Sequence, residues 1–233
     1  MSIDSLPDDL LVEISSGVGA SSLSDIRNLR LVSSSFRKFC DDRYVLSRLS
    51  LQEIPLFPWF ENPVRFSNFF KRCRRFGNPE AFYRKGFINF FIDNCNRKHK
   101  GLGFLSKAAE KGNREAKYVY GMILICRRGK LKQKGFEILS SLTKPVMSKT
   151  MEELEKLRHK IRDNVWWRGR PVMKQLKRSY VRKKCECNGE TRKFLLNNCA
   201  WHQWGADNDM KTSSACEICL WHHEVELFFD RIE

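Results

Sequence analysis

The stretch LPDDLLVEI, residues 6–14, decides how the beginning of this chain is expected to fold. Leu10, Leu11 and Ile14 fall on one side of a helix, and Leu6 lies one turn before them, whereas the acidic residues fall elsewhere. The proline suits a first helical turn, and acidic residues there complement the positive end of the helix dipole. The stretch therefore predicts a short amphipathic helix whose apolar stripe needs a packing partner, because a stripe this short cannot form a core by itself.

A Gly/Ser-rich break, SSGVGASSLSD at 15–25, follows this helix, and helical spacing resumes after it. Ser24 is the predicted N-cap of the second helical piece, with Asp25 in its first turn. A third piece follows at 41–51, so about 45 residues hold three short helical pieces, a bundle that is marginal alone. The apolar positions at helical spacing are Leu29, Val32, Phe36 and Phe39 in the second piece and Val45, Leu46, Leu49 and Leu51 in the third.

LPDDLLVEI, the central DIRNLRLVSSSFRKF (25–39) and the leucine-containing third piece resemble, in this order, an F-box between Leu6 and Leu51. One departure is GVGASS at 17–22, which stands where the family usually has a leucine-proline pair. The resemblance implies binding to the Skp1 adaptor of a cullin–RING ubiquitin ligase; the alternative is that the apolar stripe closes an intramolecular helical core. The residues that the resemblance assigns to the Skp1 contact are Leu6, Pro7, Leu10, Leu11, Ile14, Leu31 and Val32.

An internal repeat follows this segment. GNPEAFYRKG at 77–86 and GNREAKYVYG at 112–121 are near copies that lie 35 residues apart, and KGLGFLS from Lys100 and KGFEILS from Lys134 lie 34 residues apart. Two matches at nearly one period predict a structural repeat, each unit a pair of helices. The small alanine and glycine of the first helix would let a neighbouring helix approach closely.

FLSKAAEKGNREAKYVYG, residues 104–121, resembles Sel1-like repeats, which are helical-hairpin relatives of tetratricopeptide repeats. The resemblance implies a surface that binds peptides or proteins; the alternative is that the hairpins serve only as a spacer. Two units are few for a solenoid, so the flanking segments are expected to cap it, and the Phe- and Trp-rich segment 52–75 is the predicted cap on one side.

Composition bounds the class of protein. The hydrophobic fraction of 42% is enough for a folded core, and no apolar run approaches the roughly 18 residues that span a bilayer. The net charge of +16 is uneven, because residues 1–60 carry six basic and eight acidic residues. No Gly-rich phosphate loop and no Ser/His/Asp order is present, and Cys199 with His202 is a weak nucleophile–base pair, so the sequence predicts no enzyme.

The C-terminal third begins with a predicted helix and a basic run. Met151, Leu154, Leu157 and Ile161 have helical spacing, and KQLKRSYVRKK occupies 174–184. Three interpretations of the basic run stay open: a solvated face, a nuclear-import signal, or a patch that binds nucleic acid.

The cysteines fall into two groups. Cys40, Cys73, Cys95 and Cys126 are scattered among apolar residues, which predicts buried free thiols in a reducing compartment. The other group is a candidate structural zinc site, since thiolates suit Zn²⁺ in closed four-ligand sites. The alternative is a set of core thiols beneath tryptophans. The candidate zinc ligands are Cys185, Cys187, Cys216 and Cys219, with His222 as an alternative fourth ligand.

Taken together, these patterns predict a mainly α-helical protein. The F-box resemblance implies the substrate-receptor subunit of an SCF-type ubiquitin ligase, with a Skp1-like adaptor, the cullin–RING ligase and an unknown substrate protein as partners, in the nucleus, the cytoplasm or both. The alternative function is a nucleic-acid- or chromatin-associated binding protein with a structural zinc site. The predicted segments are the F-box helical bundle at 1–51, an aromatic linker or cap at 52–75, Sel1-like helical repeats at 76–145, and a basic helical segment with a Cys/His-rich tail at 146–233.

Overall fold

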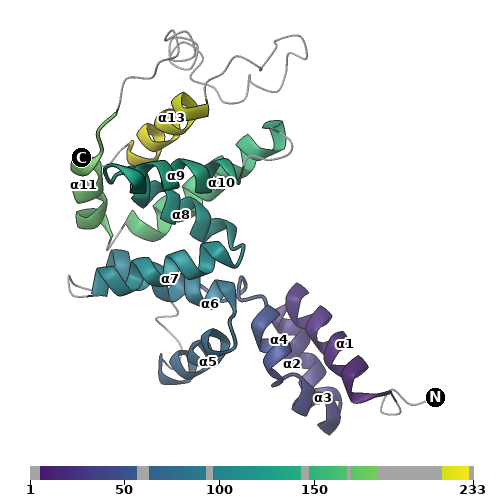
Figure 1. Ribbon diagram of the computed structural model, residues 1–233. Helices are drawn as coiled ribbons and strands as arrows, with labels where there is room; N and C mark the ends of the chain where they lie inside the picture. The colour runs from purple at the N-terminus through teal and green to yellow at the C-terminus, as the bar shows by residue number, and fades with distance from the viewer. Residues whose placement is uncertain are drawn as a thin grey trace. The chain divides into compact units, whose positions relative to one another are not determined.

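The computed structural model describes residues 6–56, 63–92, 97–142, 147–166, 169–182 and 217–230. Within these ranges every regular element is a helix, so the prediction of a mainly α fold is confirmed (Figure 1). No helix among these residues is long and apolar enough to cross a membrane. The chain packs as two compact units: Met1–Ile88 with His99–Asn113, and Asn89–Lys98 with Arg114–Glu233. The predicted boundaries of the F-box, the linker, the repeats and the tail stay a prediction. They divide the chain by sequence family, whereas these two units are defined by packing.

The first unit begins with a bundle of four helices, one more than the sequence predicts. Its core is formed by side chains from α1, α2 and α4 together with Leu51 and Ile54, which follow α4. Val45, Leu46, Leu49 and Leu51 are all buried, as their spacing predicts. The four helices are α1 (Asp8–Ser21), α2 (Leu23–Val32), α3 (Ser34–Phe39) and α4 (Arg43–Arg48).

Helix α1 continues through most of the predicted Gly/Ser-rich break, so that prediction is wrong. The helix reaches Ser21, whose hydroxyl donates to the carbonyl of Gly17. Gly19 is buried, and a Cβ there would lie 3.1 Å from a methyl of Leu49 and 3.3 Å from one of Ile26. The small residues of this stretch therefore serve close helix packing rather than a turn.

The predicted N-cap of the second helical piece is also wrong by two residues. Ser22 caps α2, because its hydroxyl accepts from the backbone N–H of Asp25. The backbone N–H groups of Leu23 and Ser24 donate instead to the carboxylate of Glu53, at 2.8 and 3.0 Å. A side chain thirty residues away thus satisfies helix N–H groups that a local cap usually satisfies.

The second predicted piece is divided in two at Ser33. The hydroxyl of Ser33 accepts from the backbone N–H of Phe36 and so begins α3. Val32 is the last residue of α2 and is 71% exposed, so its predicted place in the core is wrong, whereas Phe36 and Phe39 are buried as predicted.

Helices α5 (Pro63–Arg75) and α6 (Pro79–Phe87) complete the core of the four-helix bundle. Cys73 and Ala81 are fully buried in the same apolar cluster, and Phe66, Phe69 and Phe70 pack against it. The Phe-rich segment after the bundle is thus part of its core.

The thiols of Cys40, Cys73 and Cys126 are free and buried, as predicted, and Cys95 lies outside the described residues.

The two copies of the predicted repeat have the same local structure. Gly77 and Gly112 adopt positive φ angles of 91° and 88°, and each is followed by an asparagine that precedes a helix. These helices are α6 and α8 (Arg114–Ile125), and α7 (Lys98–Glu110) and α9 (Lys130–Ser140) are their partners. A short π-helix, η2 (Ile88–Ile92), follows α6.

Glycines mark the close approach within each hairpin. A Cβ on Gly86 would lie 2.8 Å from the backbone nitrogen of Leu105, and a Cβ on Gly121 would lie 2.6 Å from Cγ of Leu139. Gly86 and Gly121 are 35 residues apart, and their neighbours Leu105 and Leu139 are 34 residues apart, so the offsets are those of the sequence repeat. The predicted equivalence of Gly86 and Gly121 is confirmed.

Replacing Gly86 or Gly121 with leucine is expected to lower the free energy of unfolding by about 1 to 3 kcal/mol or more, because the added side chain overpacks the helix contact. The matched control is Gly103→Ala on α7, where a Cβ would meet nothing within 4 Å. That substitution is expected to raise stability by about 0.5 to 1 kcal/mol, since alanine favours helix. Chemical denaturation of the purified variants measures both effects, and equal behaviour of the variants and the control would contradict the close contact.

In the second unit, α10 (Met147–Trp166), α11 (Arg170–Ser179) and α13 (Glu217–Phe229) surround the hairpin of α8 and α9. Leu154 and Ile161 of α10 are buried, as their spacing predicts. Residues from Ala116 to Ile125 of α8 are buried almost throughout. The ring of Phe228 packs edge-on against that of Tyr118, with 5.7 Å between centroids, so α13 belongs to the core around α8.

Candidate partner-binding surface

An exposed apolar stripe runs along the beginning of the chain. Leu6, Leu10 and Ile14 recur at four-residue steps, and their side chains are 36%, 50% and 39% exposed. Pro7, the N-cap residue of α1, is exposed beside them. Residues four apart lie on one face of a helix, so Leu10 and Ile14 form an apolar strip on α1, and Leu6 is an exposed apolar side chain just before the helix begins.

Leu31 and Val32 add two more exposed aliphatic side chains at the end of α2. Leu11 of α1 and Leu29 of α2 belong to one apolar cluster, so the beginning of α1 and the end of α2 lie at the same end of the bundle. Six of the seven residues assigned to the Skp1 contact are therefore exposed, and they lie on α1, at the two residues before it and at the end of α2.

Leu11 is the exception among the seven assigned residues. It is 2% exposed and packs inside the bundle against Phe36 and Phe39 of α3. Its neighbour Leu10 points outward, because adjacent residues on a helix lie about 100° apart. Leu11 thus holds the exposed stripe in place and does not form part of the surface itself.

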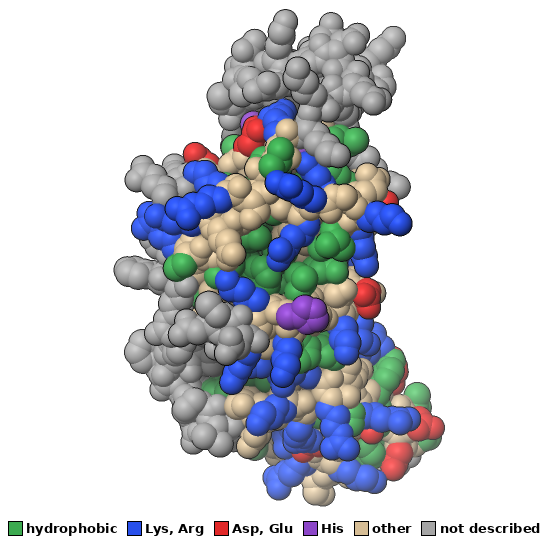
Figure 2. All heavy atoms as spheres, turned by 60° about the vertical axis from the view of Figure 1, so that its left-hand side comes forward, with side chains coloured by type: hydrophobic (Ala, Val, Ile, Leu, Met, Phe, Trp, Pro, Cys, Tyr) green, Lys and Arg blue, Asp and Glu red, His purple; other side chains and the backbone are tan. Residues whose placement is uncertain are grey.

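Charge differs between this stripe and the rest of the molecule. Asp8, Asp9 and Glu13 are exposed on α1, and Asp8 forms an ion pair with Lys38 of α3. The face drawn in Figure 2 shows many more lysine and arginine side chains than acidic ones over the described residues. The apolar stripe on α1 is therefore flanked by the acidic residues of a mostly basic protein.

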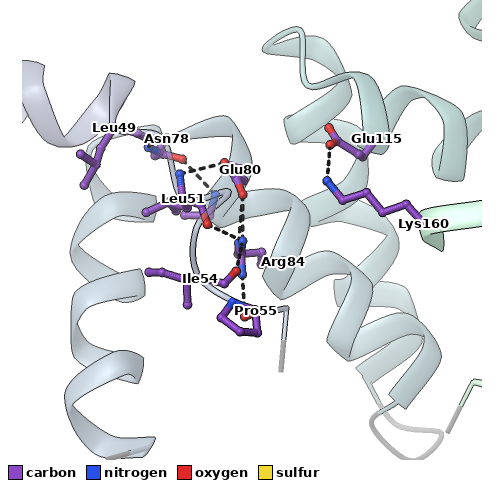
Figure 3. Close-up of polar contacts among 10 residues, drawn as sticks. Leu49, Leu51, Ile54, Pro55, Asn78, Glu80, Arg84, Glu115 and Lys160 are labelled. Carbon is purple, nitrogen blue, oxygen red and sulfur yellow. Dashed lines mark hydrogen bonds and ion pairs between the residues drawn. The ribbon is translucent and has the colours of Figure 1, made fainter. Parts of the chain in front are cut away.

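A buried polar cluster ties the four-helix bundle to α6. Arg84 is 7% exposed, and its guanidinium donates to the carbonyls of Leu51, Ile54 and Pro55 at 2.5, 2.7 and 3.0 Å (Figure 3). It also pairs with Glu80 at 2.9 Å, and the other carboxylate oxygen of Glu80 accepts from the backbone N–H of Leu51. We call Arg84 and Glu80 the Arg84 clamp.

Asn78 strengthens the same junction. Its amide nitrogen donates to the carbonyls of Leu46 and Leu49 at the end of α4, at 3.0 and 2.8 Å, while its oxygen caps α6 by accepting from Ala81. Six backbone groups between residues 46 and 55, five carbonyls and one N–H, are thus satisfied by the side chains of Asn78, Glu80 and Arg84. Within the first unit, α6 holds the bundle by directional hydrogen bonds as well as by apolar contact.

Sequence reasoning did not find the Arg84 clamp, although the repeat contains a signal for it. Arg84 stands 35 residues before Val119, which is fully buried in the second copy. An arginine at a position that is apolar and buried in the other copy indicates a buried charge with dedicated partners. Glu80 has an equivalent in Glu115, whose carboxylate pairs with Lys160 of α10 at 3.1 Å (Figure 3).

The candidate zinc ligands lie mostly outside the described residues, which include only Cys219 and His222 of that set. Cys219 is buried on α13. His222 is buried as well, and its Nδ1 contacts the hydroxyl of Tyr180 at 2.5 Å. Burial lowers the pKa of His222 to about 4. Among the described residues, no three metal-ligating side chains come together. The zinc site stays a prediction.

Comparison with known proteins agrees with both halves of the sequence resemblance. Residues 51–166 match the family described as plant tetratrico peptide repeats. The putative F-box protein At1g67623 of Arabidopsis thaliana is 55% identical over 94% of this chain and 74% of its own length. The F-box proteins At2g35280 and At1g67340 of the same plant are 33% and 32% identical over 54% and 52% of this chain, and over 74% and 32% of their own lengths. No solved structure matches.

Proposed function

The chain belongs to the plant F-box proteins, and from this premise we propose that it is the substrate-receptor subunit of an SCF-type ubiquitin ligase. In this role the four-helix bundle binds a Skp1-like adaptor, which links the protein to the cullin–RING ligase. The helical repeat and the second unit bind the substrate protein. Ubiquitin transfer belongs to other subunits, so the chain acts as an adaptor rather than an enzyme.

The observation that carries this proposal is the exposed apolar stripe of Leu6, Leu10 and Ile14. Folding alone gives no reason to keep three large aliphatic side chains exposed on α1 and just before it, because each loses free energy in contact with water. A protein partner that covers them recovers about 25 cal/mol for each Å² of apolar area removed from water. Leu31 and Val32 extend the surface available to the same partner.

The Arg84 clamp supports the proposal that one chain both binds the adaptor and presents a substrate. Such a receptor needs its adaptor-binding helices fixed to the helices that follow them in the chain. In the first unit, α6 makes this connection through Arg84, Glu80 and Asn78, which hold the backbone between α4 and α5. Buried hydrogen bonds therefore fix the four-helix bundle to α6.

We predict that Leu10→Asp combined with Ile14→Asp lowers the affinity for a Skp1-like adaptor at least about a hundredfold, because two charges then meet an apolar partner surface. Both side chains are exposed, so the fold is expected to persist. The control is Leu131→Asp, since Leu131 is as exposed as Leu10 but lies on α9 in the second unit. Binding of a purified plant Skp1-like adaptor, measured by titration calorimetry, gives the affinities.

Leu11 is left unchanged in this experiment, because a charge at that buried position would unfold the bundle and imitate a loss of binding. Circular dichroism of each variant verifies the helical fold before binding is measured. A folded Leu10→Asp, Ile14→Asp protein that binds the adaptor as tightly as the unmodified chain would refute the proposal.

A further inference from the structure

In the second unit, the end of α11 meets the beginning of α9 (Figure 1). The ammonium group of Lys132, in the first turn of α9, donates to the carbonyl of Val181 at 2.7 Å. The same ammonium lies 5.7 Å from the ring centre of Tyr180, the C-cap residue of α11. The beginning of α9 and the end of α11 thus meet at Lys132, and we call the exposed side chains of residues 127–134 and 170–182 the α9–α11 patch.

The α9–α11 patch combines aliphatic and basic side chains. Leu131 and Val181 are 50% and 55% exposed, and they are two of the three large hydrophobic side chains exposed among the described residues of this unit. Residues 126–136 and 169–182 contain no aspartate or glutamate. Figure 2 shows basic side chains interspersed with hydrophobic ones on the side of the molecule where α11 lies. The exposed basic residues of the patch are Arg127, Arg128, Lys130, Lys134, Arg170, Lys174, Lys177 and Arg178.

The backbone beneath the patch is firmly held. Val172, Met173 and Leu176 bury the opposite face of α11. At its end, the hydroxyl of Tyr180 contacts His222, and Arg182 forms an ion pair with Glu226, both on α13. A charged helix that is fixed in this way presents its basic face without a cost for ordering the backbone when a partner binds.

The composition of the patch favours a protein partner over nucleic acid. Proteins that bind single strands stack bases on exposed aromatic rings, whereas the exposed large hydrophobic side chains in the described part of this unit are Leu131, Val181 and Ile218. Exposed aliphatic side chains together with polar ones are typical of protein interfaces. Lysine and arginine around them fit carboxylates on the partner.

We propose that the α9–α11 patch is the substrate-docking surface, and that it binds an acidic segment of a protein, rich in aspartate and glutamate and carrying a large aliphatic side chain. That the bound segment belongs to a substrate rests on the proposed function, whereas its acidic and aliphatic character is inferred from the patch alone. Lys174 and Arg178 are about 6 Å apart along the axis of α11, close to the spacing of about 6.6 Å between alternate side chains of an extended segment. Acidic residues at alternate positions therefore match them.

The experiment measures binding of fluorescent peptides to the full-length protein by anisotropy. The first peptide places a pair of leucines between runs of alternating glutamate and serine. The second has serine in place of the leucines, and a single-stranded oligonucleotide of equal charge is the third probe. Three double variants are compared: Lys174→Glu with Arg178→Glu, Leu131→Ser with Val181→Ser, and, as a control at the exposed end of α7, Lys107→Glu on the helix with Lys111→Glu just after it.

The leucine-containing peptide is expected to bind more tightly than both other probes. Charge reversal at Lys174 and Arg178 is expected to weaken its binding at least about tenfold and to reduce its salt dependence, because surface charges act through a screened field. Loss of Leu131 and Val181 is expected to bring the two peptides to equal affinity. The α7 variant is expected to bind like the unmodified chain.

Three results would overturn the inference: equal binding of the two peptides to the unmodified chain, tighter binding of the oligonucleotide, or an equal loss in the α7 variant.

Adaptor binding is measured on the same proteins. Retained adaptor binding together with unaffected peptide binding in the patch variants refutes the patch alone. Absent adaptor binding together with the expected peptide results refutes the ligase role and leaves the patch as a docking surface for acidic proteins.

Discussion

Arg84→Met is expected to lower the free energy of unfolding of the first unit by about 3 to 5 kcal/mol, which is a large share of the stability of a small domain. Methionine keeps most of the volume beside the ring of Phe70, which lies 5.6 Å from the guanidinium carbon, so the loss is polar rather than a loss of packing. It leaves the carbonyls of Leu51 and Ile54 without their donor and the carboxylate of Glu80 without its cation. Thermal and chemical denaturation followed by circular dichroism measure the change.

The control for Arg84 is Arg72→Met. Arg72 pairs with Asp41 at 3.2 Å, but its side chain is 51% exposed, so the pair is screened by water and the expected loss is at most about 1 kcal/mol. Arg84→Lys is expected to be intermediate, since a single ammonium cannot reach all the oxygens that the planar guanidinium satisfies. If Arg84→Met and Arg72→Met destabilise the protein equally, the Arg84 clamp does not hold the bundle.

Arg158→Met is expected to cause the second large effect, a loss of about 3 to 5 kcal/mol in the second unit, because it leaves a buried carboxylate without its cation. The guanidinium of Arg158 donates to Glu224 at 2.6 Å, and the hydroxyl of Tyr118 donates to the other carboxylate oxygen at 2.6 Å. All three side chains are buried, and they connect α8, α10 and α13. His159→Met on the exposed side of α10 is the matched control, with an expected change within about 0.5 kcal/mol.

The effect of Arg158→Met is expected to depend on pH. Burial raises the pKa of Glu224 to about 7, against the opposing effects of Arg158 and Tyr118 and with a smaller contribution from Glu155. The folded protein therefore holds this proton more tightly than the unfolded chain, and the stability it confers is complete below about pH 4.5 and is lost as the pH rises through about 7. Without Arg158 the ionised form becomes still less favourable. The loss in Arg158→Met is thus expected to be larger at about pH 8 than at about pH 5. A loss that is the same at both pH values would show that Glu224 keeps one protonation state.

The helical class and the repeat could be predicted from the sequence because both depend on local spacing. Helical periodicity places Val45, Leu46 and Leu49 in the core, and the copied Gly-Asn-x-Glu-Ala-x-Tyr-x-x-Gly pattern predicts that Gly86 and Gly121 are equivalent. These features require information from a few neighbouring turns only. The assignment to F-box proteins with tetratricopeptide-like repeats, confirmed by the comparisons, depends on the same short patterns.

The errors arise where a distant residue changes a local preference. Ser24 has the character of an N-cap, but Glu53 takes its backbone N–H, and Ser22 becomes the cap. The stretch after residue 15 has the composition of a turn, but Gly19 is needed where α1 packs against Leu49. Such choices are decided by tertiary contacts that a sequence window does not contain.

The candidate partner-binding surface could likewise be predicted only in part. A period of about 3.6 residues identifies the apolar side of α1, but it does not separate a stripe that faces a partner from one that faces the core. Leu10 and Leu11 are neighbours in that stripe, and only the position of Phe36 and Phe39 on α3 decides that Leu11 is the inward one. The carbonyl partners of Arg84 could not be predicted for a similar reason, because they lie in residues 51–55, outside its own helix.

The position of α13 in the core around α8 has a consequence for biosynthesis. During synthesis α8 and α9 leave the ribosome long before residues 217–229 do. Until α13 is available, the apolar surface around Tyr118 and the charged side chain of Arg158 lack the helix that packs against them. During that interval the second unit is expected to be the part of the chain most exposed to aggregation, while the first unit already has all of its sequence available. Truncation before α13 is therefore expected to destabilise α8 and α10 as well as to remove the last helix, because Tyr118 and Arg158 lose their buried partners.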